Sequence, residues 1–144
     1  MRALPLPDKW VRKAIHDRIH NISVGAKTIP CYDYRTTKAL PKYYILMSSQ
    51  TNVFDDGTKC GHNWQSSIVL DVMTKYTGAG NTGSRLLADD IANEILQELD
   101  DMTLDVASGL KINKLEWNTE PDIFSNTTTE NVFRKILRYE ILIN

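Results

Sequence analysis

The clearest pattern of apolar and polar positions lies in the second half of the chain. Between residues 83 and 102, eight apolar side chains recur at helical spacing, and acidic side chains occupy the opposite side. This spacing predicts an amphipathic helix over about 83–102 that packs flat on a sheet. A second apolar stripe predicts a helix over about 9–20, with Asp8 as its N-cap.

Other segments have the patterns of strands. Residues 43–50 form a short apolar run rich in aromatic and branched side chains, and residues 64–76 alternate between two faces. We expect these strands to form an antiparallel hairpin across a long polar loop at 51–63. The alternation in 110–117 slips by one position after Ile112, which indicates a β-bulge.

The remaining segments are less regular, with a short strand expected near 29–34 and a polar loop at 118–130. Residues 132–143 fit a helix or a strand, and we interpret them as a strand because the alternation runs to the end of the chain. The order of elements predicts an α+β fold with one mainly antiparallel or mixed sheet and two helices packed on it. We expect residues 1–144 to form one domain, with 1–7 as an extended N-terminal arm.

Composition excludes several classes of protein. The 144 residues include 17 basic and 18 acidic side chains, so the chain is not a polycation that coats nucleic acid. The longest apolar run has five residues, far short of the ~20 that cross a bilayer. The N-terminus has no apolar segment of a secretory signal. Two cysteines do not make a disulfide framework, so we expect a reducing compartment.

The charge is uneven along the chain. Residues 1–20 carry five basic and two acidic side chains, whereas residues 85–108 carry one basic and seven acidic ones. One basic and one acidic surface suit contacts between unlike faces of neighbouring subunits. Two solvated helix faces would give the same pattern.

A glycine-rich segment is the main sign of enzyme chemistry. Gly78, Gly80 and Gly83 have the spacing that lets a backbone approach a pyrophosphate at a helix N-terminus. The preceding strand is polar on one face, and about 60 residues follow, too few for a doubly wound sheet. We therefore favour a plain turn between strand and helix, with a nucleotide-binding enzyme that uses Gly78–Gly83 as the alternative. We expect no enzyme activity and no cofactor.

Two histidine-containing pairs are candidates for a metal site or an activated nucleophile. Cys60 and His62 lie two positions apart, and His16 and His20 lie one helical turn apart. Neither pair has the further ligands that a closed zinc site needs, so we expect no metal. Cys60 beside His62 is the one arrangement that resembles an activated nucleophile.

Three large apolar side chains stand in otherwise polar segments: Phe54 in the first expected loop, and Ile123 and Phe124 in the second. Such a side chain either fastens its loop to the core or enters a partner. Aromatic side chains at strand positions, Trp117 among them, are expected in the core. The candidate interface residues are Phe54, Asp55, Lys59, Ile123 and Phe124.

The order and character of four segments decide the interpretation. They are Ile29-Pro30-Cys31-Tyr32-Asp33-Tyr34, Leu40-Pro41-Lys42-Tyr43-Tyr44-Ile45-Leu46, Leu70-Asp71-Val72-Met73-Thr74-Lys75-Tyr76 and Leu86-Leu87-Ala88-Asp89-Asp90-Ile91-Ala92-Asn93-Glu94-Ile95-Leu96. Over most of residues 8–144 this pattern resembles the tail terminator and tail completion proteins of tailed bacteriophages, the family that includes the minor tail protein U of lambda-like phages. The segments 51–63 and 118–130 depart from the family's pattern.

The resemblance implies a subunit that assembles into a ring, commonly a hexamer, which caps the tail tube and joins it to the neck of the capsid. It implies a structural virion protein that is assembled in the host cytoplasm, without contact to a membrane. The implied partners are further copies of the chain, the tail tube protein and neck or connector proteins, with genome DNA passing through the lumen. A neck or head-closure adaptor ring of the same particle is the alternative.

Overall fold

The computed structural model describes residues 5–33, 42–58, 61–76, 83–126 and 131–144, with the side chains of 55–58, 61–62, 83–84 and 125–126 outside the description. The helical elements are α1 (Asp8–Ile19), α2 (Gly83–Leu99) and the short 3-10 helix η1 (Val106–Ser108). The strands are β1 (Ile22–Val24), β2 (Lys27–Ile29), β3 (Cys31–Asp33), β4 (Tyr43–Thr58), β5 (Gly61–Tyr76), β6 (Ile112–Thr119), β7 (Ile123–Asn126) and β8 (Asn131–Ile143).

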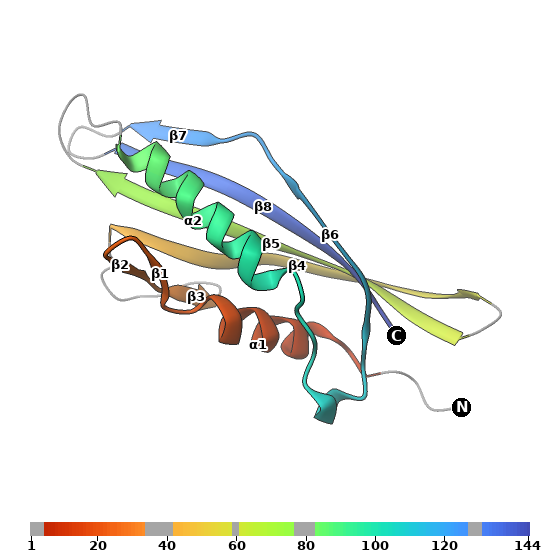
Figure 1. The fold of residues 1–144 in the computed structure, drawn as a ribbon. Coiled ribbons are helices and arrows are strands. Elements are labelled where there is room, and N and C mark those ends of the chain that lie inside the picture. Colours follow the sequence, from red (N-terminus) through yellow and green to blue (C-terminus); the bar gives the residue numbers. More distant parts are fainter. Residues whose placement is uncertain (1–4, 34–41, 59–60, 77–82, 127–130) are drawn as a thin grey trace.

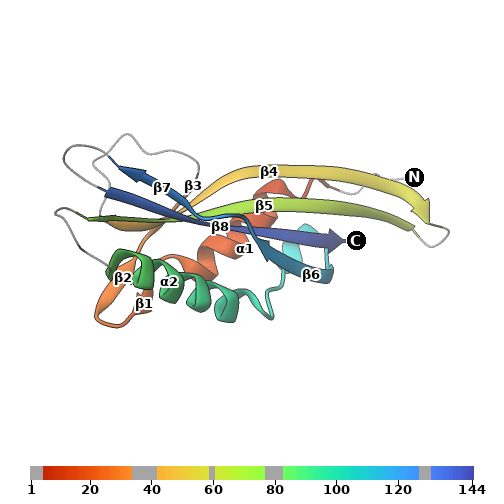
Figure 2. The same cartoon turned by 90° about the horizontal axis from the view of Figure 1, so that it is seen from above.

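Six strands form one sheet in the order β3-β4-β5-β8-β6, and β7 pairs with β8 on the same side as β6. β3 pairs with β4 in parallel, and the other pairings in this sheet are antiparallel. The long strands lie side by side, with α1 and α2 in front of them (Figure 1). Both helices lie on one side of the sheet (Figure 2). The predicted α+β fold is confirmed, as is the mixed, mainly antiparallel sheet with two helices on it.

The core lies between the helices and one face of the sheet, here called the covered face. The predicted alternation in β5 holds, because its even-numbered side chains from Ser66 to Thr74 are buried on this face. The largest buried side chains of the cluster are Ile15, Ile19, Ile29, Ile45, Met47, Ile68, Leu70, Ile91, Ile95, Leu99, Leu137 and Tyr139. The opposite side of the sheet is here called the open face.

The expected loop at 51–63 is wrong, because β4 continues to Thr58 and β5 begins at Gly61. A register shift between Met47 and Gln50 separates the half of β4 beside the core from its distal half. Side chains of the distal half lie beyond the core. Polar residues there remain in contact with water on both faces of the strand and do not lower the stability of the fold. A polar strand of this kind has the composition of a loop.

The polar loop expected at 118–130 is wrong in part. β6 extends to Thr119, and β7 pairs its Ile123–Asn126 segment with the start of β8. β7 is an edge strand whose apolar side chains are exposed. Its sequence therefore lacks the alternation of apolar and polar residues that is typical of a strand with one buried face. The C-terminal strand and the irregularity after Ile112 are confirmed, the latter as a register shift between Ile112 and Lys114.

The start of α1 also differs from expectation. Pro7 takes the N-cap position and makes no side-chain cap, and Asp8 is the first helical residue. The Asp8 carboxylate accepts a hydrogen bond from the Asn52 side chain instead, and the Gln50 amide donates to the Asp8 carbonyl at 3.1 Å. The Arg12 guanidinium donates to Gln50 at 2.7 Å. These bonds fasten the first turn of α1 to β4.

Leu99 should be a large contributor to stability, because it is fully buried at the end of α2. We expect Leu99→Ala to lower the free energy of unfolding by about 2–5 kcal/mol, the range for a leucine that leaves a cavity. The matched control Asp90→Ala, on the exposed side of the same helix, should cost under about 0.5 kcal/mol. Chemical denaturation measures both, and equal losses would contradict the assigned helix orientation.

The thiol of Cys31 should stay protonated in the folded chain far into the alkaline range. Burial, with a smaller contribution from Asp33, raises the pKa of Cys31 from 9.0 to about 12. The unfolded chain therefore loses this proton at a lower pH than the folded chain, so the thiol's contribution to stability falls as pH rises from about 9 to about 12. In a Cys60→Ser background, urea unfolding should show this decline, and Cys31→Val should remove that part of it.

Candidate functional site

Phe54 lies near the end of the projecting β4–β5 hairpin, which extends beyond both helices (Figures 1 and 2). Its ring is 42% exposed and meets the Trp64 ring edge-on, with 5.0 Å between the centroids. The Asp55 side chain and Lys59 fall outside the described residues. Phe54 is therefore accessible, one of the two alternatives that the sequence leaves open, but it lies on a strand instead of a loop.

Ile123 and Phe124 are 39% and 55% exposed and lie on β7. Ion pairs hold the approach to this strand in place. Asp122 meets Arg85 of α2 at 3.8 Å and Lys135 of β8 at 3.5 Å. The two apolar side chains are therefore presented by a strand tied to both α2 and β8.

The structure does not bring the two parts of the predicted interface together. Phe54 pairs with Trp64 of β5, whereas Phe124 pairs with Phe133, which pairs with Thr74 of β5. Positions 64 and 74 are ten residues apart, or roughly 33 Å along a strand. The candidate residues thus form two surfaces at opposite ends of the sheet.

Two further exposed apolar side chains belong to the same sheet. Val53 of β4 is 60% exposed, and Trp117 of β6 is 52% exposed. The expectation that Trp117 lies in the core is wrong. Its register with Tyr139 places it on the covered face, but β6 is the outermost strand, and helix α2 contacts β5 and β8. The period of the sequence predicts on which face of a strand a side chain lies. It does not predict whether a helix covers that part of the face.

The basic first helix and the acidic second one lie next to each other in one chain. Arg18 of α1 pairs with Asp101 at 2.6 Å and donates to the Glu98 carbonyl at 3.2 Å. The hydrogen bond from Arg18 lowers the pKa of Asp101. Arg12 meets Asp33 at 3.5 Å. Much of the charge complementarity expected between subunits is therefore used inside the subunit.

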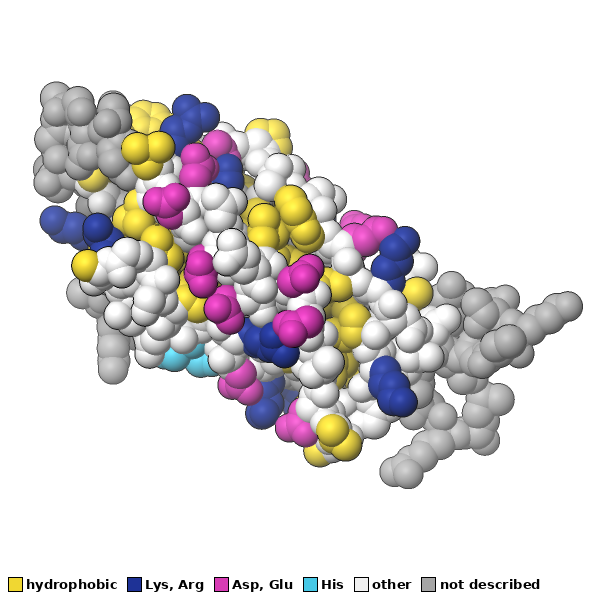
Figure 3. All heavy atoms as spheres, viewed as in Figure 1, with side chains coloured by type: hydrophobic (Ala, Val, Ile, Leu, Met, Phe, Trp, Pro, Cys, Tyr) yellow, Lys and Arg dark blue, Asp and Glu magenta, His cyan; other side chains and the backbone are white. Residues whose placement is uncertain are grey.

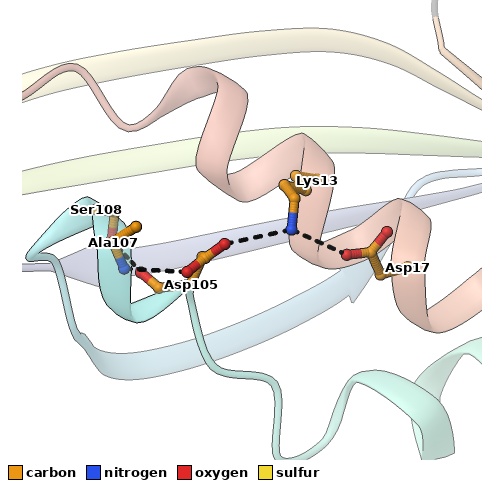
Figure 4. A network of polar contacts seen from close by, with 5 residues as sticks. All are labelled: Lys13, Asp17, Asp105, Ala107 and Ser108. Atoms are coloured by element: carbon orange, nitrogen blue, oxygen red, sulfur yellow. Dashed lines mark hydrogen bonds and ion pairs between the residues drawn. The ribbon is translucent and has the colours of Figure 1, made fainter.

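Lys13 makes a second link of this kind (Figure 4). Its ammonium lies 3.3 Å from Asp105 and 3.4 Å from Asp17, and hydrogen bonds to these carboxylates raise the pKa of Lys13. Asp105 also accepts a 3.0 Å bond from the Ala107 N–H, which, with Lys13, lowers the pKa of Asp105. The network fixes η1 against α1 and leaves Val106 93% exposed.

Acidic side chains dominate the outer surface of α2 (Figure 3). Among the described residues, Asp90, Glu94 and Glu98 have no ion pair with a basic side chain. An anionic surface repels phosphate, so the outer surface of α2 is unsuited to contact with DNA.

The open face carries a buried ion pair at its centre. Asp71 of β5 meets Arg134 of β8 at 2.9 Å, with 5% of the Asp71 side chain and 34% of the Arg134 side chain exposed. Within the described part of the chain, Asp71 Oδ1 and Arg134 Nε are buried without a hydrogen-bond partner. Nearby, Arg138 donates to Glu120 at 3.0 Å. The charges on this face are thus mixed.

A shallow groove of about 370 Å³ crosses the open face from β4 to β6. Its lining is both polar and apolar and comes from β4, β5, β8 and β6. The lining residues are Thr51, Val53, Gln65, Ser66, Ser67, Lys114, Glu116, Glu140, Ile141 and Leu142.

Residues weighed for enzyme chemistry do not form a site in the described structure. Cys60, the His62 side chain and Gly78–Thr82 fall outside the described residues. His16 and His20 stack with 4.4 Å between ring centroids, and His20 Nδ1 accepts the Cys31 N–H at 3.1 Å. No group of three metal-binding side chains occurs among the described residues. Neither α1 nor α2 is long and apolar enough to cross a membrane.

Comparison with known proteins gives two findings. The family model described as tail completion protein gp17 matches residues 11–144. A chain of the solved structure titled "Virion of native gene transfer agent (GTA) particle" has a similar fold, with a TM-score of 0.65, 12% sequence identity and coverage of 98% of both chains. No curated protein matches the sequence.

The Asp71–Arg134 pair should behave as a buried unit. We expect Arg134→Met to lower the free energy of unfolding by about 3 kcal/mol, because it leaves the buried Asp71 carboxylate unpaired. Asp71→Leu combined with Arg134→Met should cost less than Arg134→Met alone. Arg138→Met, which removes a more exposed pair, should cost about 0.5 kcal/mol. Urea denaturation of these variants checks the order, and a double variant that is the least stable would contradict it.

Proposed function

The chain belongs to the tail completion protein gp17 family, and from this membership we propose that it is a structural, non-enzymatic protein of a phage virion that completes the tail. The match covers residues 11–144, nearly the whole chain, and carries the proposal. We further propose that residues 1–144 act as one domain and that several copies, six in the commonest arrangement of this kind, form a ring. The ring caps the tail tube and connects it to the neck of the capsid.

The two separated surfaces support a joining role. A ring that connects two structures needs one contact surface toward each of them, and all its subunits present the same surfaces in the same direction. Phe54 stands at one end of the sheet, and Ile123 and Phe124 stand at the other. Exposed aromatic side chains on rigid strands are suitable anchors for such contacts. We propose that one end meets the tail tube and the other meets the neck.

Charge supports passage of DNA without specific binding. The chain carries a formal net charge of −1, and the outer surface of α2 is acidic. The open face has basic and acidic side chains in pairs, so it neither repels phosphate strongly nor holds it. We propose that genome DNA passes through the ring. Assembly in the host cytoplasm and a final place in the virion follow from the same role.

The anchor residues can be tested in a phage that lacks this gene. We expect Phe54→Asp and Phe124→Asp to keep the circular dichroism spectrum of the wild type, because both side chains are about half exposed. Each should abolish the joining of tails to heads, because a carboxylate in an apolar contact removes most of the binding energy. Complementation titre and electron microscopy of the particles measure the effect.

Val106→Asp is the matched control, since Val106 is 93% exposed, the largest exposed fraction among the apolar side chains that the structure describes, and lies on η1, outside the strands β4 and β7 that carry the proposed anchors. It should complement at the wild-type level. If Phe54→Asp and Phe124→Asp both fold and also complement fully, these residues are not the anchors. If particles without the protein still join heads to tails, the proposed function itself is wrong.

A further inference from the structure

Among the described strands, the sheet has an unpaired edge on each side. On one side, β3 pairs with β4 only from Ile45 to Met47, and among the described strands none pairs with the distal half of that edge. On the other side, β6 is the last strand of the sheet. A free edge presents unpaired backbone N–H and C=O groups and is a template for another strand, so proteins that remain monomeric protect such edges.

Both edges carry a large exposed apolar side chain. Val53 lies on the distal half of β4, and Trp117 lies on β6, and more than half of each side chain is exposed. Neither belongs to the core cluster or to the side chains packed against it. A strand added at either edge would cover part of this apolar surface.

The two edges lie at the same level of the sheet. One row of paired residues runs from Gln50 of β4 through Ile68 and Tyr139 to Trp117 of β6. β4, β5, β8 and β6 alternate in direction, so β6 runs opposite to β4. A β4 strand from another copy, placed beside β6 with the same tilt, would continue the antiparallel pattern without a break.

The curvature of the sheet is compatible with this continuation. The groove on the open face is lined from β4, β5, β8 and β6, so this face is hollowed across the width of the sheet. Both helices lie on the other side (Figure 2). A sheet that curves toward its open face can close upon itself with the helices outside, where they do not collide.

We infer that the distal half of β4 in one copy pairs with β6 of the next copy, so that the sheet continues from subunit to subunit. This inference rests on the proposed ring and specifies its lateral contact. The contact joins two different edges, and such a head-to-tail contact repeats until the ring closes. The partner at each edge is a second copy of this chain.

Paired cysteines test this contact in assembled particles. Val53→Cys is combined in turn with Lys114→Cys, Glu116→Cys or Asn118→Cys, which lie on the open face of β6 like Val53 on β4. Three positions on β6 are used because the β4 strand of one copy can be shifted along the β6 strand of the next. The full-length chain, with Cys60→Ser in all variants, complements a phage that lacks the gene, and purified particles are oxidised and run on a non-reducing gel.

We expect one of the three pairs to give a ladder of cross-linked chains, at least tenfold above the control. The matched control combines Val53→Cys with Val106→Cys on η1, which is 93% exposed but lies on neither edge strand. Particles that are infectious and contain the protein in multiple copies, yet show no cross-link above this control, would overturn the edge contact and leave the ring standing. Tails from the wild-type phage that lack the protein would instead count against the proposed function.

A second experiment tests the same contact without cysteine pairs, in case these pairs themselves prevent assembly. Val53→Lys and Trp117→Lys each place a charge on one edge, and we expect each to fold normally but to lower the complementation titre at least a hundredfold. Val106→Lys should leave the titre unchanged. Wild-type titres for both edge variants would overturn the inference.

Discussion

A mismatch in length between helices and strands governs this structure. β4 and β5 have 16 residues each, which at ~3.3 Å per residue is roughly 53 Å. α2 has 17 residues and α1 has 12, which at ~1.5 Å per residue is roughly 25 Å and 18 Å. The helices can therefore bury only part of the sheet. The rest of the β4–β5 hairpin extends beyond the helices. It is held by its own ladder, by the pairing of β5 with β8 from Trp64 onward, and by the bonds from Gln50 and Asn52 to Asp8.

The same mismatch explains which elements the sequence predicts correctly and which elements it does not. α1, α2, β5 and β8 lie against the core, and burial gives their sequences a strong period of 3.6 or 2. The distal half of β4 and β7 contribute no side chain to the core cluster, so nothing forces apolar and polar residues to alternate there. Their polar residues resemble those of loops although the backbone is extended. Phe54, Ile123 and Phe124, which are expected in loops, therefore lie on strands. Their polar neighbours allow either burial against the core or exposure to a partner, and the structure shows all three exposed.

Trp117 shows a different limit of sequence analysis. Its position in β6 fits the covered face, and a tryptophan on that face is normally buried. Its exposure depends on the order of strands in the sheet, because β6 stands outside the reach of α2. The prediction from the charges of α1 and α2 is limited in the same way. The composition shows that the two segments carry opposite net charges. Only the packing of the two helices shows that Arg18 and Asp101 form an ion pair within one subunit.

Exposed edges require a compromise between solubility of the free subunit and readiness to assemble. Lys114 and Glu116 on β6 pair with each other at 2.8 Å on the open face, and charged side chains of this kind discourage unspecific strand addition. On the other face of the same strand, Trp117 remains accessible. An edge with charges on one face and an aromatic ring on the other accepts only a strand that offers suitable neighbours on both faces. Such selectivity would let subunits stay apart in solution and still associate in one defined register.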